Sequence, residues 1–334
     1  MKVVRFLEEP IWRQFVDGHP AGNVFHTPEM YQVFTRTKNH RPTLWAVVDD
    51  DGRVLVLLLA IQIVLLNCLR CLTTRAVAYG SVLCAPGPEG QEALTLLLRT
   101  YVRQVDGTPL FTELRNLSDL GDVQPILREH GFGYEGHLNY LIDLNCAPEA
   151  ILQNIGPRTR KHIRRELRRG EILFEEATDR ERVAVCYELL CRTYRRAGVP
   201  LADRSLFEAA FDLLYPKGMA RFTLVRLGQT PVAVSVELLY KDVMYGWYGG
   251  IDRAHRSHMP NELLMWHILQ WGSENGYRLY DFGGAGRTDE EYGVRDFKAK
   301  FGGTLVCYGR NTYVHRPLLL RLSQWGFEAY RRFL

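Results

Sequence analysis

The sequence has no apolar run long enough to cross a bilayer. Its longest run, "VLVLLLAIQIVLL" from Val54 to Leu66, contains one Gln and falls short of the about 20 residues that a spanning helix needs. We interpret it as a long buried strand. The chain also opens with "MKVVRFLEEP" and so lacks the apolar region of a secretory signal. These absences predict a cytoplasmic protein, with a peripheral position at the inner membrane face as the alternative.

Cysteine pairs and metal-binding patterns are scarce. The seven cysteines are scattered along the chain, and Cys68 and Cys71 form its one C-x-x-C. That pair lies in an apolar, strand-like stretch and has no second Cys or His pair at metal spacing beside it. We therefore expect filler thiols in a reducing compartment, and no metal site.

Motifs for ATP chemistry are missing. The stretch "LYDFGGAG", residues 279 to 286, contains the Asp-Phe-Gly triplet found in protein kinases. The chain has no Gly-rich kinase loop, V-A-I-K strand, H-R-D loop or P-loop to accompany it. We expect no ATP-dependent phosphoryl transfer.

Positive charge is concentrated in one segment. The whole chain carries a net charge of +4, while "PRTRKHIRRELRR", residues 157 to 169, holds seven Lys or Arg and one Glu. Four of these cations fall on one face of a helix, whose like charges repel unless anions lie against them. A solvated charged face is the alternative. The residues predicted to bind phosphates, of a tRNA or of a lipid- or nucleotide-linked acceptor, are Arg158, Arg160, Lys161, Arg164, Arg165 and Arg168.

A pattern of elements recurs about 170 residues apart. Residues 43–64 and 221–241 each suggest a strand, a tight polar turn and a longer strand. Each is followed by an extended stretch, an amphipathic helix (89–105 and 260–275), a strand after a Gly, and a final pair of strands (131–144 and 301–314). The repetition predicts a duplicated α/β (α+β) domain, a mixed, mainly antiparallel sheet with one central crossover helix.

The segments outside this pattern are expected to be helical. Helices are predicted at 148–169, at 179–198 with Asp179 as its cap and Gly198 as its stop, and at 203–215 with Asp203 as its cap. The tail after Pro317 has apolar residues at helical spacing, and we expect it to pack on the N-terminal half, with a membrane-surface helix as the alternative. The predicted boundaries are 1–145, 146–311 and a helical tail, 312–334.

The segment that begins at residue 276, "GYRLYDFGGAGRTDEEYGVRDFKAKFGG", offers the best candidate site. A strand ends at Asp281, and the glycines at 283, 284 and 286 permit positive φ and leave room for a substrate beside bare backbone. The alternative is a tight bulge between core strands in which Asp281 bonds to local amides. The residues alone leave both interpretations open.

This segment resembles a known family. The run Tyr280-Asp281-Phe282-Gly283-Gly284, the acidic loop, Phe297-Lys298 and Phe301-Gly302-Gly303 are similar to the C-terminal signature of the FemAB-like family. Its members are tandem GNAT-fold acyltransferases that attach amino acids to peptidoglycan precursors. Residues 155–170 also resemble the Arg/Lys-rich helix that opens the second domain in that family. The resemblance covers roughly residues 150 to 311 and implies two GNAT-like domains and an aminoacyl-tRNA donor.

One departure bears on the donor. Enzymes of the GNAT fold that use acetyl-CoA carry a Gly-rich loop before the central helix, whereas this chain has no glycine between Gly250 and Gly272. A helix N-terminus at 259–262 still offers N–H groups to an anion. The missing loop favours aminoacyl-tRNA over acyl-CoA as the donor.

Both donors are already activated, so the reaction needs no ATP, no metal and no tightly bound cofactor. As the resemblance implies, Lys298 is predicted to stabilise the oxyanion, with a solvated lysine as the alternative. Asp281 is predicted to accept a proton or orient the attacking amine, with a structural cap as the alternative. The predicted substrate-binding residues are Gly283, Gly284, Tyr245, Trp247, Tyr248 and Phe297.

The sequence therefore predicts an N-acyltransferase that moves an aminoacyl group from tRNA to an amine of a cell-wall precursor, or of another small peptidic or phosphorylated acceptor. A first alternative is an acyl-CoA-dependent enzyme of the same fold that acts on an amino sugar or polysaccharide precursor. A second is a non-catalytic tandem module that binds an anionic lipid or nucleic acid through residues 157–169.

Overall fold

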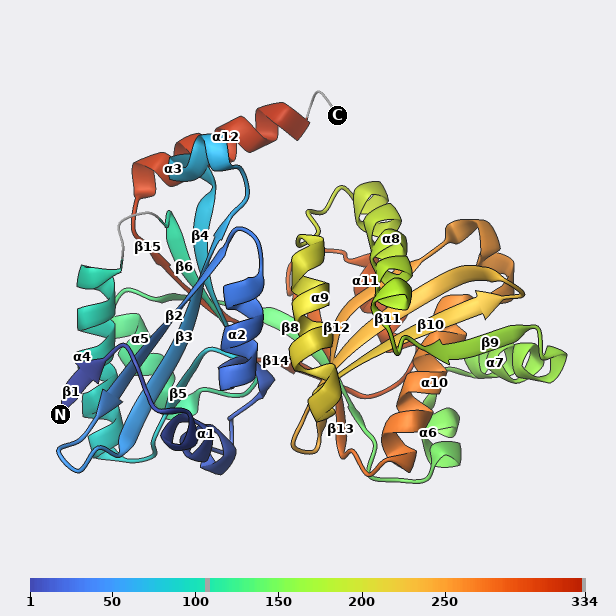
Figure 1. Ribbon diagram of the computed structural model, residues 1–334, viewed down its shortest axis with the longest axis horizontal. Coiled ribbons are helices and arrows are strands. Elements are labelled where there is room, and N and C mark those ends of the chain that lie inside the picture. Colours follow the sequence, from blue (N-terminus) through green and yellow to red (C-terminus); the bar gives the residue numbers. More distant parts are fainter. Residues whose placement is uncertain (106–108, 332–334) are drawn as a thin grey trace. The chain divides into compact units, whose positions relative to one another are not determined.

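A computed structural model describes residues 1–105 and 109–331, apart from the side chains of 67 and 327–331 (Figure 1). By its internal contacts the chain divides into two units. The first comprises Met1–Gly136 and Tyr308–Leu334, and the second comprises His137–Cys307. Each unit is described by itself.

The first unit is built on an eight-stranded sheet. Its order is β1-β2-β3-β4-β6-β15-β7, and β5 pairs with β3 outside this path. Neighbouring strands are antiparallel except β4 and β6, which are parallel. The strands are β1 (Lys2–Val4), β2 (His40–Val48), β3 (Val54–Val64), β4 (Thr74–Tyr79), β5 (Val82–Cys84), β6 (Phe111–Arg115), β7 (Gly133–Glu135) and β15 (Arg310–Val314).

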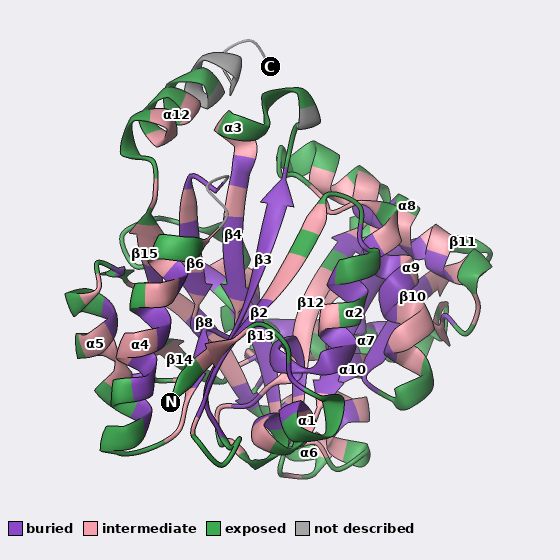
Figure 2. Ribbon diagram, turned by 60° about the vertical axis from the view of Figure 1, so that its left-hand side comes forward, coloured by how far each residue is buried: buried purple, intermediate pink, exposed green. Residues whose placement is uncertain are grey.

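Helices cover the β2–β3 hairpin of this unit on both faces (Figure 1). Every residue of β3 is buried, as predicted for the longest apolar run (Figure 2). Such a continuous apolar strand is expected where both faces of a sheet are covered. The helices are α1 (Glu9–Gly18), α2 (Pro28–Arg36), α3 (Arg70–Thr73), α4 (Pro88–Gln104), α5 (Gln124–Glu129) and α12 (Pro317–Arg331), with 3₁₀ turns η1 (Val24–His26), η2 (Asn67–Leu69) and η3 (Gly121–Val123).

The second unit is built on a seven-stranded sheet of order β14-β8-β13-β12-β11-β10-β9. Its parallel neighbours are β12 and β13. The strands are β8 (His137–Asp143), β9 (Ile172–Glu176), β10 (Ala220–Leu227), β11 (Thr230–Tyr240), β12 (Val243–Ile251), β13 (Leu279–Arg287) and β14 (Thr304–Cys307).

Alternate residues of this second sheet face different helices. Phe222 of β10 meets Phe211 of α9, while Val225 belongs to the core that α10 covers. This alternation follows from the two-residue period of a strand. The helices are α6 (Pro148–Asn154), α7 (Pro157–Arg169), α8 (Arg180–Ala197), α9 (Arg204–Leu213), α10 (Pro260–Glu274) and α11 (Gly293–Ala299), with 3₁₀ turns η4 (Tyr215–Lys217) and η5 (Arg253–His258).

The predicted tandem GNAT-like architecture is confirmed, with one correction to its strand pairing. We expected each half to close with its own final pair of strands. Instead β15 lies between β6 and β7, and β8 lies between β13 and β14. Only Gly136 separates β7 from β8, and a hairpin commonly needs at least two loop residues. The contact units therefore divide at Gly136 and Cys307, whereas the predicted boundaries are 145 and 311.

Local signals place the helices well. Asp179 accepts a hydrogen bond from the backbone N–H of Arg182, and Gly198 ends α8 in the left-handed conformation. Asp203 caps α9 in the same way through Ser205. These are the roles that Asp and Gly take at helix ends.

Two local expectations are wrong. The helix expected at 148–169 is divided into α6 and α7 at residues 155–156, because Pro157 restricts the residue before it to extended conformations. Cys68 and Cys71 lie in the helical turns η2 and α3 rather than in a strand, and both thiols are exposed. No helix in the described part of the chain is long and apolar enough to span a membrane.

Candidate active site

The candidate site begins where β12 and β13 part. The parallel pairing joins Val243–Tyr245 to Leu279–Asp281 and goes no further. Beyond it, β12 continues beside β11 up to Ile251, and β13 continues beside β8 up to Arg287. Two neighbouring strands of one sheet therefore separate directly after Tyr245 and Asp281, the residues at which the sequence predicted a site.

Asp281 is buried at this branching point. Its Oδ1 accepts hydrogen bonds from Asn139 Nδ2 of β8, at 2.6 Å, and from the backbone N–H of Gly283, at 2.7 Å. Burial raises the pKa of this carboxyl group, while the bonds from Asn139 and Gly283 and the charge of Lys298 act against that rise. The local cap that we weighed as an alternative is thus present. A role in proton transfer stays a prediction.

Lys298 of α11 is also buried, with 7% of its surface exposed. Its Nζ donates to three consecutive carbonyl oxygens of β13, those of Phe282, Gly283 and Gly284, at 2.7, 3.2 and 2.8 Å. Burial lowers the pKa of Lys298 to about 8, and the Asp281 charge opposes this shift. The alternative of a solvated lysine is therefore wrong, because α11 turns the side chain inward.

A second cation of α11 extends this contact. Arg295 Nε donates to the carbonyl oxygen of Ala285 at 2.9 Å, and its guanidinium also bonds to the carbonyl of Arg287. Together Lys298 and Arg295 hold five carbonyls at the Gly-rich end of β13. Because these five carbonyl oxygens point toward α11, the C-terminal end of β13 is held away from β12.

A glycine is needed at position 283 because β12 approaches its backbone closely, and the absent side chain leaves no open space for a substrate. Its φ is +69°, and a Cβ at this position would lie 3.2 Å from both the carbonyl oxygen of Gly246 and the hydroxyl oxygen of Tyr245. Gly284, the next residue, is exposed. Of the two predicted glycines, Gly284 is exposed, while the side-chain space at Gly283 is already occupied; substrate binding at either residue stays a prediction.

Two of the predicted aromatic residues, Trp247 and Tyr248, pack together against α9. The pairing of β11 with β12 shifts between Val236 and Glu237, which leaves Trp247 as the extra residue of a bulge. Trp247 and Tyr248 both contact Phe207 of α9, with Tyr248 at 4.8 Å between ring centroids. Both rings are half-buried. Phe297 packs edge-on against Phe301 and is half-buried too.

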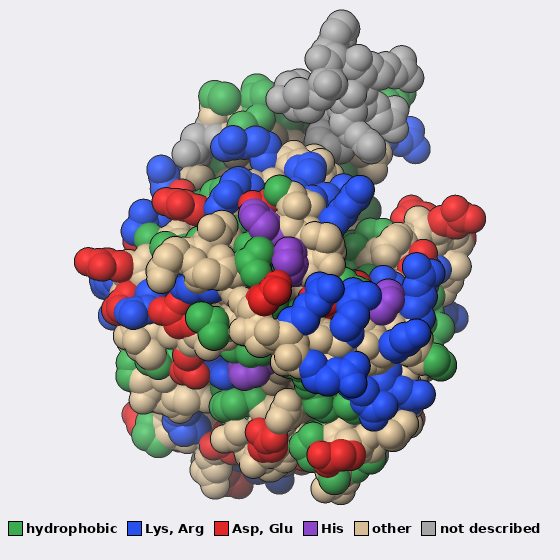
Figure 3. Space-filling model, turned by 90° about the vertical axis from the view of Figure 1, so that its right-hand side faces the viewer, with side chains coloured by type: hydrophobic (Ala, Val, Ile, Leu, Met, Phe, Trp, Pro, Cys, Tyr) green, Lys and Arg blue, Asp and Glu red, His purple; other side chains and the backbone are tan. Residues whose placement is uncertain are grey.

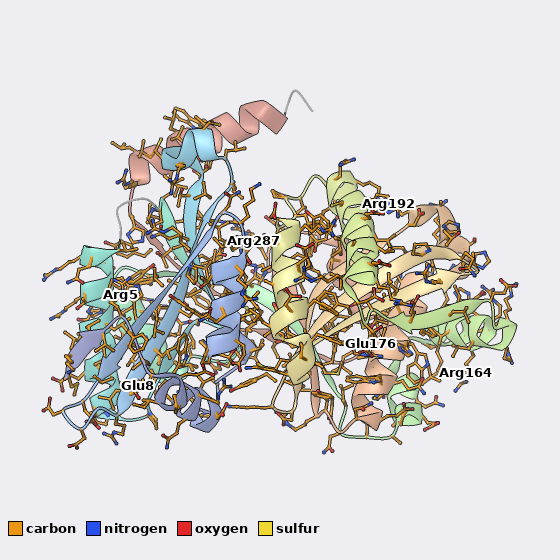
Figure 4. The ribbon with its side chains drawn as sticks, viewed as in Figure 1. Arg5, Glu8, Arg164, Glu176, Arg192 and Arg287 are labelled. Carbon is orange, nitrogen blue, oxygen red and sulfur yellow. The ribbon has the colours of Figure 1, made fainter. Side chains whose placement is uncertain are left out.

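The basic helix α7 divides into paired and unpaired cations. Arg165 and Arg169 bond to the buried Glu166, and Arg160 donates to the carbonyl and side chain of Gln153. The other four, for which the described residues supply no acidic partner, are exposed: Arg158, Lys161, Arg164 and Arg168. Arg164 projects from α7 at one end of the second unit in Figure 4, and Figure 3 shows Lys and Arg side chains gathered on that side of the unit.

Sequence reasoning missed three residues of this region. Asn139 lies 142 positions from Asp281, Arg295 looked like surface charge, and Glu237 is an isolated acid in an apolar strand. Glu237 is fully buried opposite Gly246 in the strand register, and burial raises its pKa to about 7. A charged residue inside an otherwise apolar strand was the available signal for Glu237.

Comparisons with known proteins agree with this geometry. Residues 157–298 match the family model described as an acetyltransferase (GNAT) domain. The lipid II:glycine glycyltransferase of Staphylococcus saprophyticus is 24% identical over 218 residues, which cover 46% of this chain and 52% of that protein. The chain spans about half to two thirds of the length of the curated relatives it matches.

Solved structures show the same fold over nearly the whole chain. The crystal structure of FemX has a TM-score of 0.73 at 18% identity, covering 96% of this chain and 99% of FemX. A tandem GNAT protein from the clavulanic acid biosynthesis pathway has a TM-score of 0.59 at 13% identity, covering 94% and 98%.

The chain has two mixed sheets, each with a central crossover helix, and in the second sheet the parallel strand pair parts. These features define a tandem protein of the GNAT acyltransferase fold. Within that class, the chain is similar to proteins of the FemAB-like family. The predicted fold class is confirmed, and the comparisons agree with the predicted resemblance to the FemAB-like family.

Proposed function

We propose that this chain transfers an aminoacyl group from aminoacyl-tRNA to an amine of a lipid-linked cell-wall precursor. The observation that carries the proposal is the parting of β12 and β13 beside the buried Lys298, in a chain whose relatives include lipid II:glycine glycyltransferases. Beyond Tyr245 the edge of β12 is no longer paired with β13, and an unpaired strand edge can hydrogen-bond the extended chain of a substrate.

The reaction is a direct attack on an ester. The amine nitrogen forms a bond to the acyl carbon, the bond from that carbon to the ribose oxygen breaks, and the amine proton ends on the ribose oxygen. The transition state carries negative charge on the carbonyl oxygen, which the site has to stabilise.

Lys298 stabilises this oxygen through the backbone as well as through its charge. Its three protons are already donated to the carbonyls of residues 282–284. Each of these peptide groups is polarised by the ammonium, and its N–H end, at residues 283–285, becomes a stronger donor. The N–H of Gly283 is taken by Asp281, and the pairing of Gly284 with Asn139 of β8 uses one N–H of the next two residues. The other N–H of the pair Gly284 and Ala285 is the proposed donor.

The four unpaired cations of α7 hold phosphates of the tRNA or of the lipid-linked acceptor. Arg158, Lys161, Arg164 and Arg168 are exposed, and phosphate groups are the anions that clustered arginines bind most strongly. Asp281 keeps the end of β13 in place through Asn139 and Gly283. Tyr245, Trp247, Tyr248 and Phe297 line the acceptor side.

The test supplies purified protein with a mixture of labelled aminoacyl-tRNAs and lipid-linked peptidoglycan precursors, and detects the extended product by mass spectrometry. A parallel reaction replaces the tRNA with acetyl-CoA. We expect product from the tRNA reaction only. Product from acetyl-CoA alone would replace the donor with acyl-CoA, and no product from either would overturn the proposal.

Substitution of Lys298 tests the site. Lys298→Met keeps the length of the side chain and removes the charge, so we expect the initial rate to fall by roughly a hundredfold or more. The matched control is Lys217→Met, which removes an exposed lysine of η4 in the same unit, outside the proposed site. An unchanged rate in folded Lys298→Met protein would remove Lys298 from the site.

A further inference from the structure

In the described part of the first unit, a group of large apolar side chains is exposed on the surface. It is formed by η2 and α3, in the connection after β3, and by α12, and we call it the α3–α12 surface. Figures 1 and 2 show α3 and α12 together at one end of this unit. Its large exposed side chains are Leu65, Leu66, Leu69, Leu318, Leu322 and Trp325, with 45, 51, 45, 79, 52 and 70% of their surfaces exposed.

Helix α12 is fixed to the unit by its other face. Ser323 Oγ donates to the carbonyl oxygen of Leu72 at 2.6 Å, and Leu319 and Leu320 are partly covered. Leu318, Leu322 and Trp325 follow one another at helical spacing on the outer face. The expected docking of the tail on the N-terminal half and an outward apolar stripe are therefore both present.

An outward stripe of this kind is unusual for a helix that packs on its own protein. Such helices turn their apolar face inward, and contiguous exposed apolar patches mark sites of interaction. The patch combines leucines with a tryptophan, the residues that amphipathic helices place in the boundary between lipid headgroups and acyl chains.

Charge identifies the partner. Arg70, Arg316 and Arg321 are exposed on the same two segments. The ranges 64–78 and 315–327 contain no Asp or Glu, and the one acid of α12 is Glu328, near its C-terminal end. Arginines therefore outnumber acids on these segments. Leucine and tryptophan with a rim in which arginines predominate fit a bilayer that carries anionic headgroups.

We propose that the α3–α12 surface docks this protein onto an anionic lipid bilayer, with Leu318, Leu322 and Trp325 entering the headgroup region and Arg70 and Arg321 contacting lipid phosphates. The docking is independent of the transfer reaction proposed above, because it uses no residue of the candidate site. It explains why α12 leaves its apolar stripe exposed.

The experiment measures co-sedimentation of the full chain with phosphatidylcholine vesicles, with and without about 30% phosphatidylglycerol. We expect binding to the anionic vesicles that weakens with salt. The double variant Leu318→Ser/Trp325→Ser should lower the partition coefficient by about tenfold or more. Its matched control is Phe6→Ser/Leu173→Ser, which removes two equally exposed apolar side chains elsewhere.

A second pair of variants tests the arginines. Arg70→Glu/Arg321→Glu should abolish the preference for anionic vesicles, while Arg99→Glu/Arg103→Glu on the exposed side of α4 should leave it unchanged. All these positions are on the surface, where such changes leave the fold intact.

Three results would overturn the inference. One is the absence of binding to anionic vesicles. Another is binding that survives Leu318→Ser/Trp325→Ser but is lost in Arg164→Glu/Arg168→Glu, since α7 would then be the lipid contact. The third is a stable dimer, seen by light scattering, that Leu318→Ser/Trp325→Ser dissociates, because a second copy would then cover the surface.

Discussion

Lys298 illustrates how one buried cation serves both structure and chemistry. An ammonium group has three protons, and all three go to neighbouring carbonyls of one strand. A neutral amine has two, so loss of the charge also releases one carbonyl. Arginine keeps the charge but needs more room, and Lys298→Arg is therefore not a conservative change at this position.

Glu237 gives a prediction for stability. Burial raises the pKa of its carboxyl group from 4.5 to about 7, so the folded state binds a proton more tightly than the unfolded state. The contribution of Glu237 to the free energy of unfolding is greatest below about pH 4.5, and it is lost as the pH rises through about 7. Glu237→Gln removes the ionisation, and its Oε1 still accepts the bond from Ser235.

We therefore compare the free energy of unfolding of Glu237→Gln with that of the wild type. We expect the difference in favour of the variant to grow by about 2 to 3 kcal/mol when the pH is raised from about 5 to about 8. Urea unfolding of both proteins at the two pH values measures the difference. Burial also lowers the pKa of His267, to about 4. Because His267 is present in both proteins, its contribution to the free energy of unfolding cancels in the difference. Equal free energies of unfolding at both pH values would mean that Glu237 is solvated.

At the scale of elements, α7 should act as an electrostatic contact. Arg164 and Arg168 are exposed and one helical turn apart, so Arg164→Glu/Arg168→Glu reverses two adjacent charges. We expect weaker tRNA binding and a shallower dependence of the binding constant on salt. Filter binding at several salt concentrations provides both quantities.

The matched control for α7 is again Arg99→Glu/Arg103→Glu. These two arginines have the same spacing and lie on the exposed side of α4, and their reversal changes the net charge by the same amount. Equal losses in the two variants would assign the effect to net charge, and α7 would then be a solvated face.

Elements whose signals are local could be predicted from the sequence. The hairpins, the crossover helices and the caps at Asp179 and Asp203 depend on residues within a few positions of one another. The partners of β8 and β15 could not be predicted, because periodicity indicates a strand but not its neighbour. The bond from Asn139 to Asp281 was missed for the same reason. Lys298 was predicted by resemblance, but its burial depends on how α11 packs.

At the scale of the whole molecule, the exchanged strands predict which fragments fold. Residues 137–307 hold all strands of the seven-stranded sheet, whereas 146–307, cut at the predicted boundary, lacks β8. Without β8, the hydrogen-bonding edges of β13 and β14 lose their partner. We expect cooperative thermal unfolding of 137–307 and none of 146–307, measured by circular dichroism. Similar transitions in both fragments would show that β8 is dispensable.

The position of β15 also has a consequence for synthesis. A ribosome delivers the N-terminal segment first, and domains made this way ordinarily fold in that order. Here the first sheet has a gap between β6 and β7 until residues 310–314 emerge, after every strand of the second sheet has been made. The half that is translated first is therefore the last to be completed, and a nascent chain stalled before residue 310 would expose an open sheet edge to chaperones.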